Sequence, residues 1–190
     1  KGVDVTVLSA NGKVIDKPLK AEGPNPLCKD TQNKEPDPLQ PENFLSAGTL
    51  LTFGKFKFLN LGDLTWDREL MLACPINKIG TVTLFQATHH GFFNDLSGPP
   101  ALVWAIKPQV VIVENGPTKG LTTGGYETLT KIPGVEGIWQ GHRAIRNDDA
   151  HNTTESMSAN LGTTQDETQG NWIKASISKD GSFTVTNSRN

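Results

Sequence analysis

Short apolar runs separated by turn residues follow one another along this chain of 190 residues. Three pairs of runs flank a dipeptide that favours a tight turn, and each pair predicts a β-hairpin. The hairpins are predicted over residues 3–15, 50–61 and 172–186, with turns at Asn11-Gly12, Gly54-Lys55 and Asp180-Gly181. In the first hairpin, Val3, Val5 and Val7 alternate with polar residues, which is the period of a strand.

Between the second and third hairpins, runs of strand length alternate with runs of helical character. Strands are predicted at residues 81–87, 109–114 and 136–139, and helices at residues 66–73, 99–106 and 126–132. Thr65 is the expected N-cap of the first helix, with Asp67 and Glu69 near its positive end. Pro75 ends that helix. Alternation of strands and helices at this spacing predicts an α/β fold with a layered sheet and flanking helices.

Two long stretches lack such a pattern and are predicted to be irregular loops. Residues 17–42 hold six prolines among polar residues, and loops of that length are usually functional or disordered. Residues 141–170 are polar, with a short helix expected near residues 154–160. Because no internal repeat is visible, we expect one domain over residues 1–190.

Composition and charge exclude several classes of protein. Hydrophobic residues make up 35% and charged residues 20% of the chain, which lies outside the range typical of disordered proteins. A net charge of -2 argues against a basic surface for duplex nucleic acid, since phosphate affinity depends on clustered cations. No apolar run approaches the roughly 20 residues that a membrane helix needs. Because the chain begins at Lys1 without a signal-like apolar segment, we expect a fragment or a processed chain.

Two cysteines, Cys28 and Cys74, lie far apart in the sequence. Without a C-x-x-C pair, both a thiolate zinc knuckle and a thioredoxin-type redox site are excluded. Two interpretations stay open, namely one disulfide in an exported protein or two buried thiols. The abundance of Asn, Thr and Gly favours export, so we expect a periplasmic or extracellular bacterial protein.

Candidate chemistry gathers where two of the predicted strands end. Asp63 follows the second hairpin, and His89-His90 follows the strand at residues 81–87. In open α/β sheets ligand sites lie beyond the carboxyl ends of strands. Carboxylates and imidazoles are ligands that Zn²⁺, Mn²⁺ and iron accept. The adjacent Gly62 and Gly91 allow sharp turns that would project these side chains into a cleft.

Each of these residues also has an ordinary structural explanation. An Asp directly after a strand is most often a turn or helix-capping residue. Adjacent histidines in a strand point to opposite faces, so at most one of His89 and His90 would face a given metal. Taken alone, the two short motifs leave a metal site and a structural role both open.

The order and spacing of several motifs over about residues 40–140 resemble the later half of the metallo-β-lactamase fold. The matching elements are Asn43-x-x-Ser46, the hairpin that ends in Gly62-Asp63-Leu64, the His89-His90-Gly91 turn, and the strand and loop at residues 108–116. The pattern is similar to that of the hydrolase domain of ComEC-like bacterial competence (DNA-uptake) proteins and of related choline-phosphate esterases. This resemblance implies an αββα-type fold of which the chain holds the C-terminal half.

The same resemblance implies a site with two divalent metals, zinc in the first place and manganese or iron as alternatives. It implies that Asp63 bridges the two metals and that one of His89 and His90 is a ligand of the second metal. We favour His89 as that ligand and His90 as the catalytic residue that faces the substrate phosphate. The family signature H-x-H-x-D-H, which supplies most of the ligands, does not occur in the chain, so we expect an upstream segment to supply it.

The activity implied is hydrolysis of a phosphodiester, either a small molecule or single-stranded nucleic acid. Asn115, Lys119 and His142 follow predicted strands at the same edge and are candidate substrate-binding residues, although ordinary loop positions would also explain them. Two alternatives stay open: a non-catalytic exported binding or structural module, and a β-lactamase or lactonase on the same fold. A serine nucleophile has no support, because no G-x-S-x-G occurs.

Overall fold

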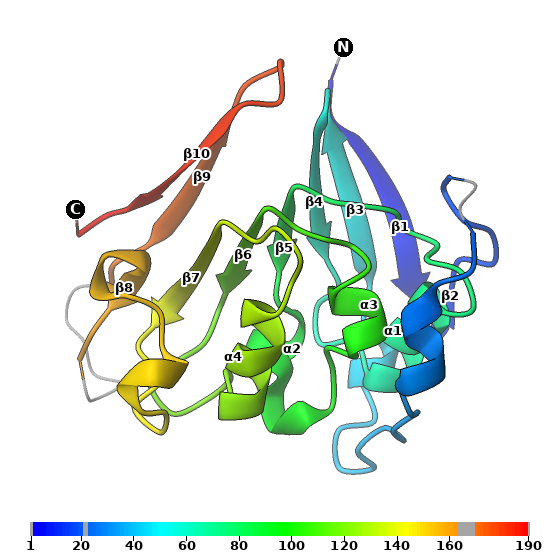
Figure 1. The fold of residues 1–190 in the computed structure, drawn as a ribbon, viewed down its shortest axis with the longest axis horizontal. Helices are drawn as coiled ribbons and strands as arrows, with labels where there is room; N and C mark the ends of the chain where they lie inside the picture. The colour runs from blue at the N-terminus through cyan, green and yellow to red at the C-terminus, as the bar shows by residue number, and fades with distance from the viewer. Residues whose placement is uncertain (1, 21–22, 163–169, 190) are drawn as a thin grey trace.

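The computed structural model describes residues 2–20, 23–162 and 170–189. Within these residues an eight-stranded mixed sheet has the strand order β2-β1-β3-β4-β5-β6-β7-β8 (Figure 1). Its strands are β1 Asp4–Ala10, β2 Lys13–Val14, β3 Gly48–Phe53, β4 Phe56–Asn60, β5 Leu84–Gln86, β6 Val110–Val113, β7 Gly137–His142 and β8 Ser158–Asn160. The strands from β2 to β4 pair antiparallel, and those from β4 to β8 pair parallel. The predicted α/β class is confirmed.

The α-helices of the described residues gather together beside the sheet. They are α1 Trp66–Ala73, α2 Thr88–Phe92, α3 Pro100–Val103 and α4 Thr123–Thr130. Short 3₁₀ helices are η1 Pro26–Asp30, η2 Asn43–Leu45, η3 Phe93–Asp95, η4 Asp149–His151 and η5 Glu155–Met157. Helix α3 contacts both α1 and α4, and α4 also contacts α2 (Figure 1). None of the helices described is both long and apolar enough to cross a membrane.

The hydrophobic core lies between the helices and one face of the sheet. Leu59, Phe85, Val111 and Ile138 are direct neighbours across β4, β5, β6 and β7, so their side chains share that face. All four are buried in one cluster with Leu72, Leu102 and Leu129 of the helices. Burial of each such side chain stabilises the fold by about 1.5–3 kcal/mol. Burial of this row of four side chains holds the four parallel strands side by side and in register.

The opposite face of the sheet is also apolar but is covered at one end only. Val5, Leu51, Phe58, Leu84 and Val110 form a row across β1, β3, β4, β5 and β6. Val110 and Leu84 are buried, Phe58 and Leu51 are half-buried, and Val5 is 60% exposed. This face is therefore buried at β5 and β6 and most exposed at β1.

A C-terminal hairpin covers the protected end of that face. Its strands are β9 Ile173–Ile177 and β10 Phe183–Asn187, which form a separate two-stranded sheet. Phe183 packs edge-on against Phe56 with ring centroids 5.3 Å apart, and it lines one hollow together with Val110 and Val185. Figure 1 shows this hairpin reaching from β7 toward the turn between β3 and β4, well away from the α-helices.

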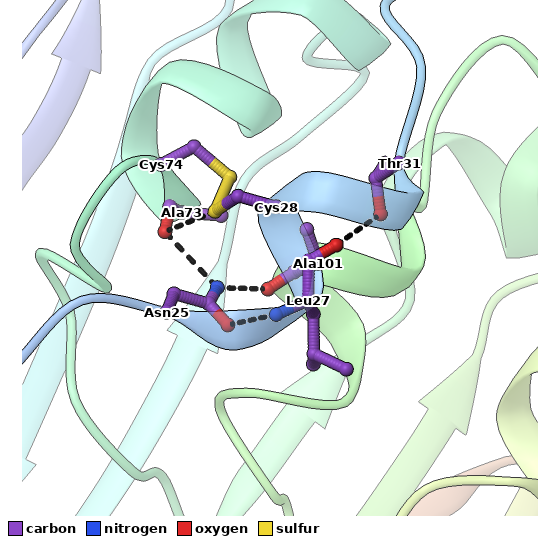
Figure 2. The surroundings of a disulfide bond; sticks show 7 residues. All are labelled: Asn25, Leu27, Cys28, Thr31, Ala73, Cys74 and Ala101. Atoms are coloured by element: carbon purple, nitrogen blue, oxygen red, sulfur yellow. Dashed lines mark hydrogen bonds between the residues drawn. A yellow bond between two sulfur atoms is a disulfide. The ribbon is translucent and has the colours of Figure 1, made fainter.

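A disulfide between Cys28 and Cys74 ties the first long loop to the end of α1 (Figure 2). Beside it, the Asn25 amide donates hydrogen bonds to the carbonyl oxygens of Ala73 (3.1 Å) and Ala101 (2.8 Å). The side-chain oxygen of Asn25, Oδ1, accepts a hydrogen bond from the backbone N–H of Leu27. A single buried side chain thus joins η1 to carbonyls of α1 and α3. Of the two interpretations of the cysteines, the structure has the disulfide.

Most predicted elements are confirmed, with shifted ends. All three hairpins form, and α1 has the predicted bounds. Helix α3 is shorter than predicted, and α4 begins three residues earlier because the Thr122 hydroxyl accepts a hydrogen bond from the Gly125 N–H. The loop predicted at 141–170 is wrong in part, since β7 runs on to His142 and β8 adds an edge strand; residues 163–169 of that loop lie outside the described residues.

Candidate active site at the carboxyl edge of the sheet

The carboxyl ends of the four neighbouring parallel strands β4 to β7 lie along one edge of the sheet. Asp63 follows β4, the histidine pair follows β5, Asn115 follows β6, and His142 is the last residue of β7. Every strand of this set therefore delivers a predicted site residue to the same edge. Strand order alone brings to one edge residues that lie up to 79 positions apart in the sequence (Asp63 and His142), because neighbouring parallel strands end on the same side.

The histidine pair lies in a left-handed turn rather than in a strand. Strand β5 ends at Gln86, and the backbone then has φ of 52° at His89, 60° at His90 and 92° at Gly91. The expectation that adjacent histidines point to opposite faces assumed an extended backbone, and the backbone here is not extended. L-residues in this region cost about 1–2 kcal/mol each, so surrounding contacts must hold the turn in place.

Two of those contacts pass through the backbone. The N–H of His89 donates to the carbonyl oxygen of Gly62 at 3.0 Å, which ties the histidine turn to the turn that carries Asp63. The carbonyl oxygen of His90 accepts from the N–H of Leu121 at 2.9 Å. Close packing adds a third constraint, since a Cβ built on Gly120 would lie 2.2 Å from the same carbonyl oxygen.

Asp63 and His90 form the closest pair of predicted ligands. The Asp63 Oδ1 atom lies 3.8 Å from His90 Nε2, longer than a hydrogen bond. His90 Nδ1 lies 3.0 Å from the carbonyl oxygen of Glu114, which can only accept, so Nδ1 carries the proton. In the neutral ring Nε2 then keeps its lone pair. Two ligands each about 2.1 Å from a tetrahedral Zn²⁺ lie about 3.4 Å apart, so a small inward shift of this pair would bring both atoms onto one cation.

His89 is more deeply buried than His90, with only 4% of its surface exposed. This burial lowers the pKa of His89, and the nearby carboxylate of Asp63 opposes the shift. The charges of His90 and Lys119 lower the pKa further, whereas Asp37 raises it. At neutral pH the His89 ring is therefore uncharged, which is the form that binds metals.

Asn115 and His142 are joined to each other. The Asn115 amide donates to the carbonyl oxygen of His142 at 2.6 Å, so it links the ends of β6 and β7. Its own Oδ1 is buried and has no hydrogen-bond partner in the described part of the chain. The His142 ring is buried, with Nδ1 2.8 Å from the carbonyl oxygen of Arg143, and is not an ordinary exposed loop histidine. Lys119 is exposed and near enough to affect His89 electrostatically.

The protein matches nothing in three comparisons. No protein-family model, no curated protein and no solved structure gives a match. The resemblance to metallo-β-lactamase-fold hydrolases therefore stays a prediction from the motifs.

The ligands predicted at this edge do not make up a complete metal shell among the described residues. Among the residues that the structure describes, no group of three or more His, Cys, Asp or Glu side chains is arranged to hold a metal ion. Asp63 and His90 fit two of the three or four protein ligands that zinc takes. Asp63 and His90 would therefore fill only part of the coordination shell of a bound metal ion.

Sequence reasoning missed two acidic residues near the histidine turn. Asp37, in the first long loop, is close enough for its charge to raise the pKa of His89. Glu69 was expected near the positive end of α1, but its side chain is fully buried and accepts a hydrogen bond from Thr88. A signal for Glu69 existed, because it shares one helix face with the apolar Leu72 and Ala73. No pattern in the sequence points to Asp37.

Proposed function

We propose that residues 1–190 carry the later half of a metal-dependent phosphodiester hydrolase. The observation that carries this proposal is the Asp63–His90 pair, with 3.8 Å between Oδ1 and Nε2 and with His90 Nδ1 held by a backbone carbonyl. Such a carbonyl contact fixes the tautomer and orientation of ligating histidines. An ordinary turn-capping role for Asp63 would not require an oriented imidazole opposite it.

Each residue of the edge has a distinct part in this proposal. Asp63 would contribute the negative charge that holds the cations. The sequence motifs favour His89 as the ligand and His90 as the residue that faces the phosphate, but the 3.8 Å distance between Asp63 and His90 favours His90 as the first nitrogen ligand. His89, neutral at pH 7, is the second candidate nitrogen ligand. A divalent metal held there would lower the pKa of a bound water toward about 7 and would stabilise developing negative charge. The exposed Lys119 ammonium lies on the next loop, where it would contact a substrate phosphate. Asn115, whose amide already donates to the carbonyl oxygens of Gly116 and His142, would hold that loop in place.

We further propose that a segment outside residues 1–190 supplies the remaining ligands. The support is the apolar sheet face that stays open at β1, where Val3, Val5 and Val7 are all more than half exposed. Contiguous exposed apolar surface of this kind marks an interface. A second sheet layer on this face would place additional side chains at the same edge of the fold. This segment is the missing half implied by the H-x-H-x-D-H signature.

The disulfide supports the proposed export of the protein. Disulfides persist in oxidising compartments such as the periplasm and the extracellular space. Cys28 and Cys74 are partly buried and pack against the hydrophobic core, so the bond between η1 and the end of α1 contributes to the fold itself. We therefore keep a periplasmic or extracellular location as part of the proposal.

Zinc titration of the chain tests the metal site directly. Zn²⁺ added to residues 1–190 should shift the ring resonances of His89 and His90 in NMR spectra, and Asp63→Asn should weaken that response at least about tenfold. The matched control is Asp149→Asn, an exposed acid on η4. Unchanged histidine resonances at millimolar zinc would contradict the metal site and favour the non-catalytic binding module.

The reaction is tested on a protein that includes the upstream segment. Turnover of bis(p-nitrophenyl) phosphate that disappears in Asp63→Ala would support the phosphodiesterase. Turnover of a chromogenic β-lactam instead would favour the β-lactamase alternative.

A further inference from the structure

Glu69 is a carboxylic acid that the fold buries completely, and neither the core nor the proposed ligand set accounts for it. Its Oε1 accepts a hydrogen bond of 2.6 Å from the Thr88 hydroxyl. Its Oε2 accepts a hydrogen bond of 2.5 Å from the backbone N–H of Gly98. Burying a carboxyl group is unfavourable unless it is hydrogen-bonded, so both contacts are needed to offset the loss of water.

The two partners of Glu69 mark the two ends of one segment. Thr88 directly precedes His89, and Gly98 follows the loop that leaves the histidine turn. Between them the backbone takes positive φ at six positions, which are His89, His90, Gly91, Phe92, Asn94 and Asp95. A run of left-handed residues persists only where surrounding contacts over-determine it. The Glu69 side chain supplies such a contact at each end.

Helix α1 also reaches this segment a second time. The N–H of Trp66, at the start of the helix, donates to the carbonyl oxygen of Leu96 at 2.8 Å. Helix α1 therefore connects the two parts of the candidate site. It directly follows the turn that carries Asp63, and its hydrogen bonds hold the segment that carries the histidine turn.

We propose that Glu69 is a positioning residue that holds both ends of segment 88–98 and thereby sets the geometry between Asp63 and the two histidines. This inference rests on the proposed metal site, because it assigns Glu69 a role toward that site. Burial raises the pKa of Glu69 to about 8, so at neutral pH the side chain is largely an uncharged acid. The isosteric amide of glutamine can then keep both contacts, because its oxygen accepts from the Gly98 N–H and its NH2 donates to the Thr88 hydroxyl oxygen.

The test compares Glu69→Gln with Glu69→Leu in residues 1–190. Glu69→Leu removes both contacts at similar volume, and it should move the ring ¹⁵N and ¹H resonances of His89 and His90 and weaken zinc binding about tenfold or more. Glu69→Gln should restore both readouts to nearly the original values. Glu136→Gln, an exposed acid at the other end of β7, is the matched control and should change neither.

A purely structural role would lower the melting temperature without moving the histidine resonances of the folded protein, and that result would overturn the inference. If Glu69→Leu does not fold, Thr88→Val decides, because it removes one contact and retains the shape of the side chain. The two proposals fail separately: absence of zinc binding in the unchanged chain overturns the metal site, whereas unmoved histidine resonances in Glu69→Leu or Thr88→Val overturn the positioning role.

Discussion

At the scale of single residues, the candidate site depends on a backbone conformation that few residues adopt readily. His89, His90 and Gly91 all have positive φ, and the glycine is also tightly enclosed. A Cβ built on Gly91 would lie 2.6 Å from Val113 Cγ1 and 3.1 Å from the backbone of Leu121. Gly91 therefore serves both the turn and the packing beneath it.

Substitution of Gly91 should lower the free energy of unfolding by more than its positive φ alone explains. Gly134 has a similar φ of 80°, but a Cβ there would meet no atom within 4 Å. Gly134→Ala should lower the free energy of unfolding by about 1–2 kcal/mol, the cost of a left-handed L-residue. Gly91→Ala should cost a further 1–3 kcal/mol or so for overpacking, and a β-branched residue more. Urea denaturation measures both, and equal losses at the two positions would contradict the packing role.

The pH dependence of stability should report the buried acid at position 69. Its pKa is about 8 in the folded protein against 4.5 for the exposed group. Between these values the folded state keeps a proton that the unfolded state releases. The contribution of Glu69 to the free energy of unfolding is therefore greatest below pH 4.5. Between pH 4.5 and pH 8 it falls by up to about 1.4 kcal/mol per pH unit, and above pH 8 it no longer changes.

Denaturation of the original chain and of Glu69→Gln at pH 5, 6.5 and 8 measures this effect. The amide variant cannot titrate, so its stability relative to the original chain should rise by a few kcal/mol over that range. Parallel curves for the two proteins would show that the acid at 69 is ionised throughout.

At the scale of elements, a covalent link and a capping side chain attach the first long loop. Cys28 in η1 is bonded to Cys74 at the end of α1, and Asn25 bonds to carbonyls of α1 and α3. The disulfide closes a loop of 46 residues. Chain entropy for a loop of that length corresponds to about 4 kcal/mol of stabilisation.

Removal of the disulfide should lower the free energy of unfolding by about that amount. The double variant Cys28→Ser/Cys74→Ser compares the two states without a free thiol, and a urea titration measures the loss. Addition of a reductant should destabilise the original chain and leave the double variant unchanged. A loss below about 1 kcal/mol would mean that packing and Asn25 hold the loop without the covalent bond.

Helices and strands were predictable from the sequence where the residues that determine them lie close together along the chain. Hairpins with a glycine turn and the helix over residues 66–73 carry their signals within a few residues, and they form as predicted. Strand β8 was missed because Ser158–Asn160 is short and polar, and only its pairing with β7 makes it a strand. The left-handed turn was missed because positive φ is uncommon even for histidine, so the residue type alone does not predict it. Tertiary contacts impose the turn.

At the scale of the whole molecule, the sheet has one filled face and one that is partly open. Leu8 and Val5 lie on the same strand but on opposite faces, at 1% and 60% exposure. The first belongs to the core, and the second to the surface proposed to receive another layer. This contrast gives a direct comparison within one strand.

Val5→Lys should change the free energy of unfolding of residues 1–190 by no more than about 0.5 kcal/mol, because the site is exposed. Leu8→Ala should lower it by about 2–5 kcal/mol through loss of core packing. In a protein that includes the upstream segment, Val5→Lys should become destabilising, because the charge would then be buried. Urea denaturation of the shorter and longer proteins measures the difference, and a neutral result in the longer one would contradict a second layer on this face.

The parallel pairing of β4, β5, β6 and β7 also fixes a length. Neighbouring strands lie about 4.8 Å apart, so the three steps from β4 to β7 span about 14 Å. Asp63 stands at one end of this span and His142 at the other. A molecule that touches both must extend well past a single phosphate group, with one substituent over each flank. For the hydrolase that we propose, the width of four strands would thus favour long, thin substrates over compact ones.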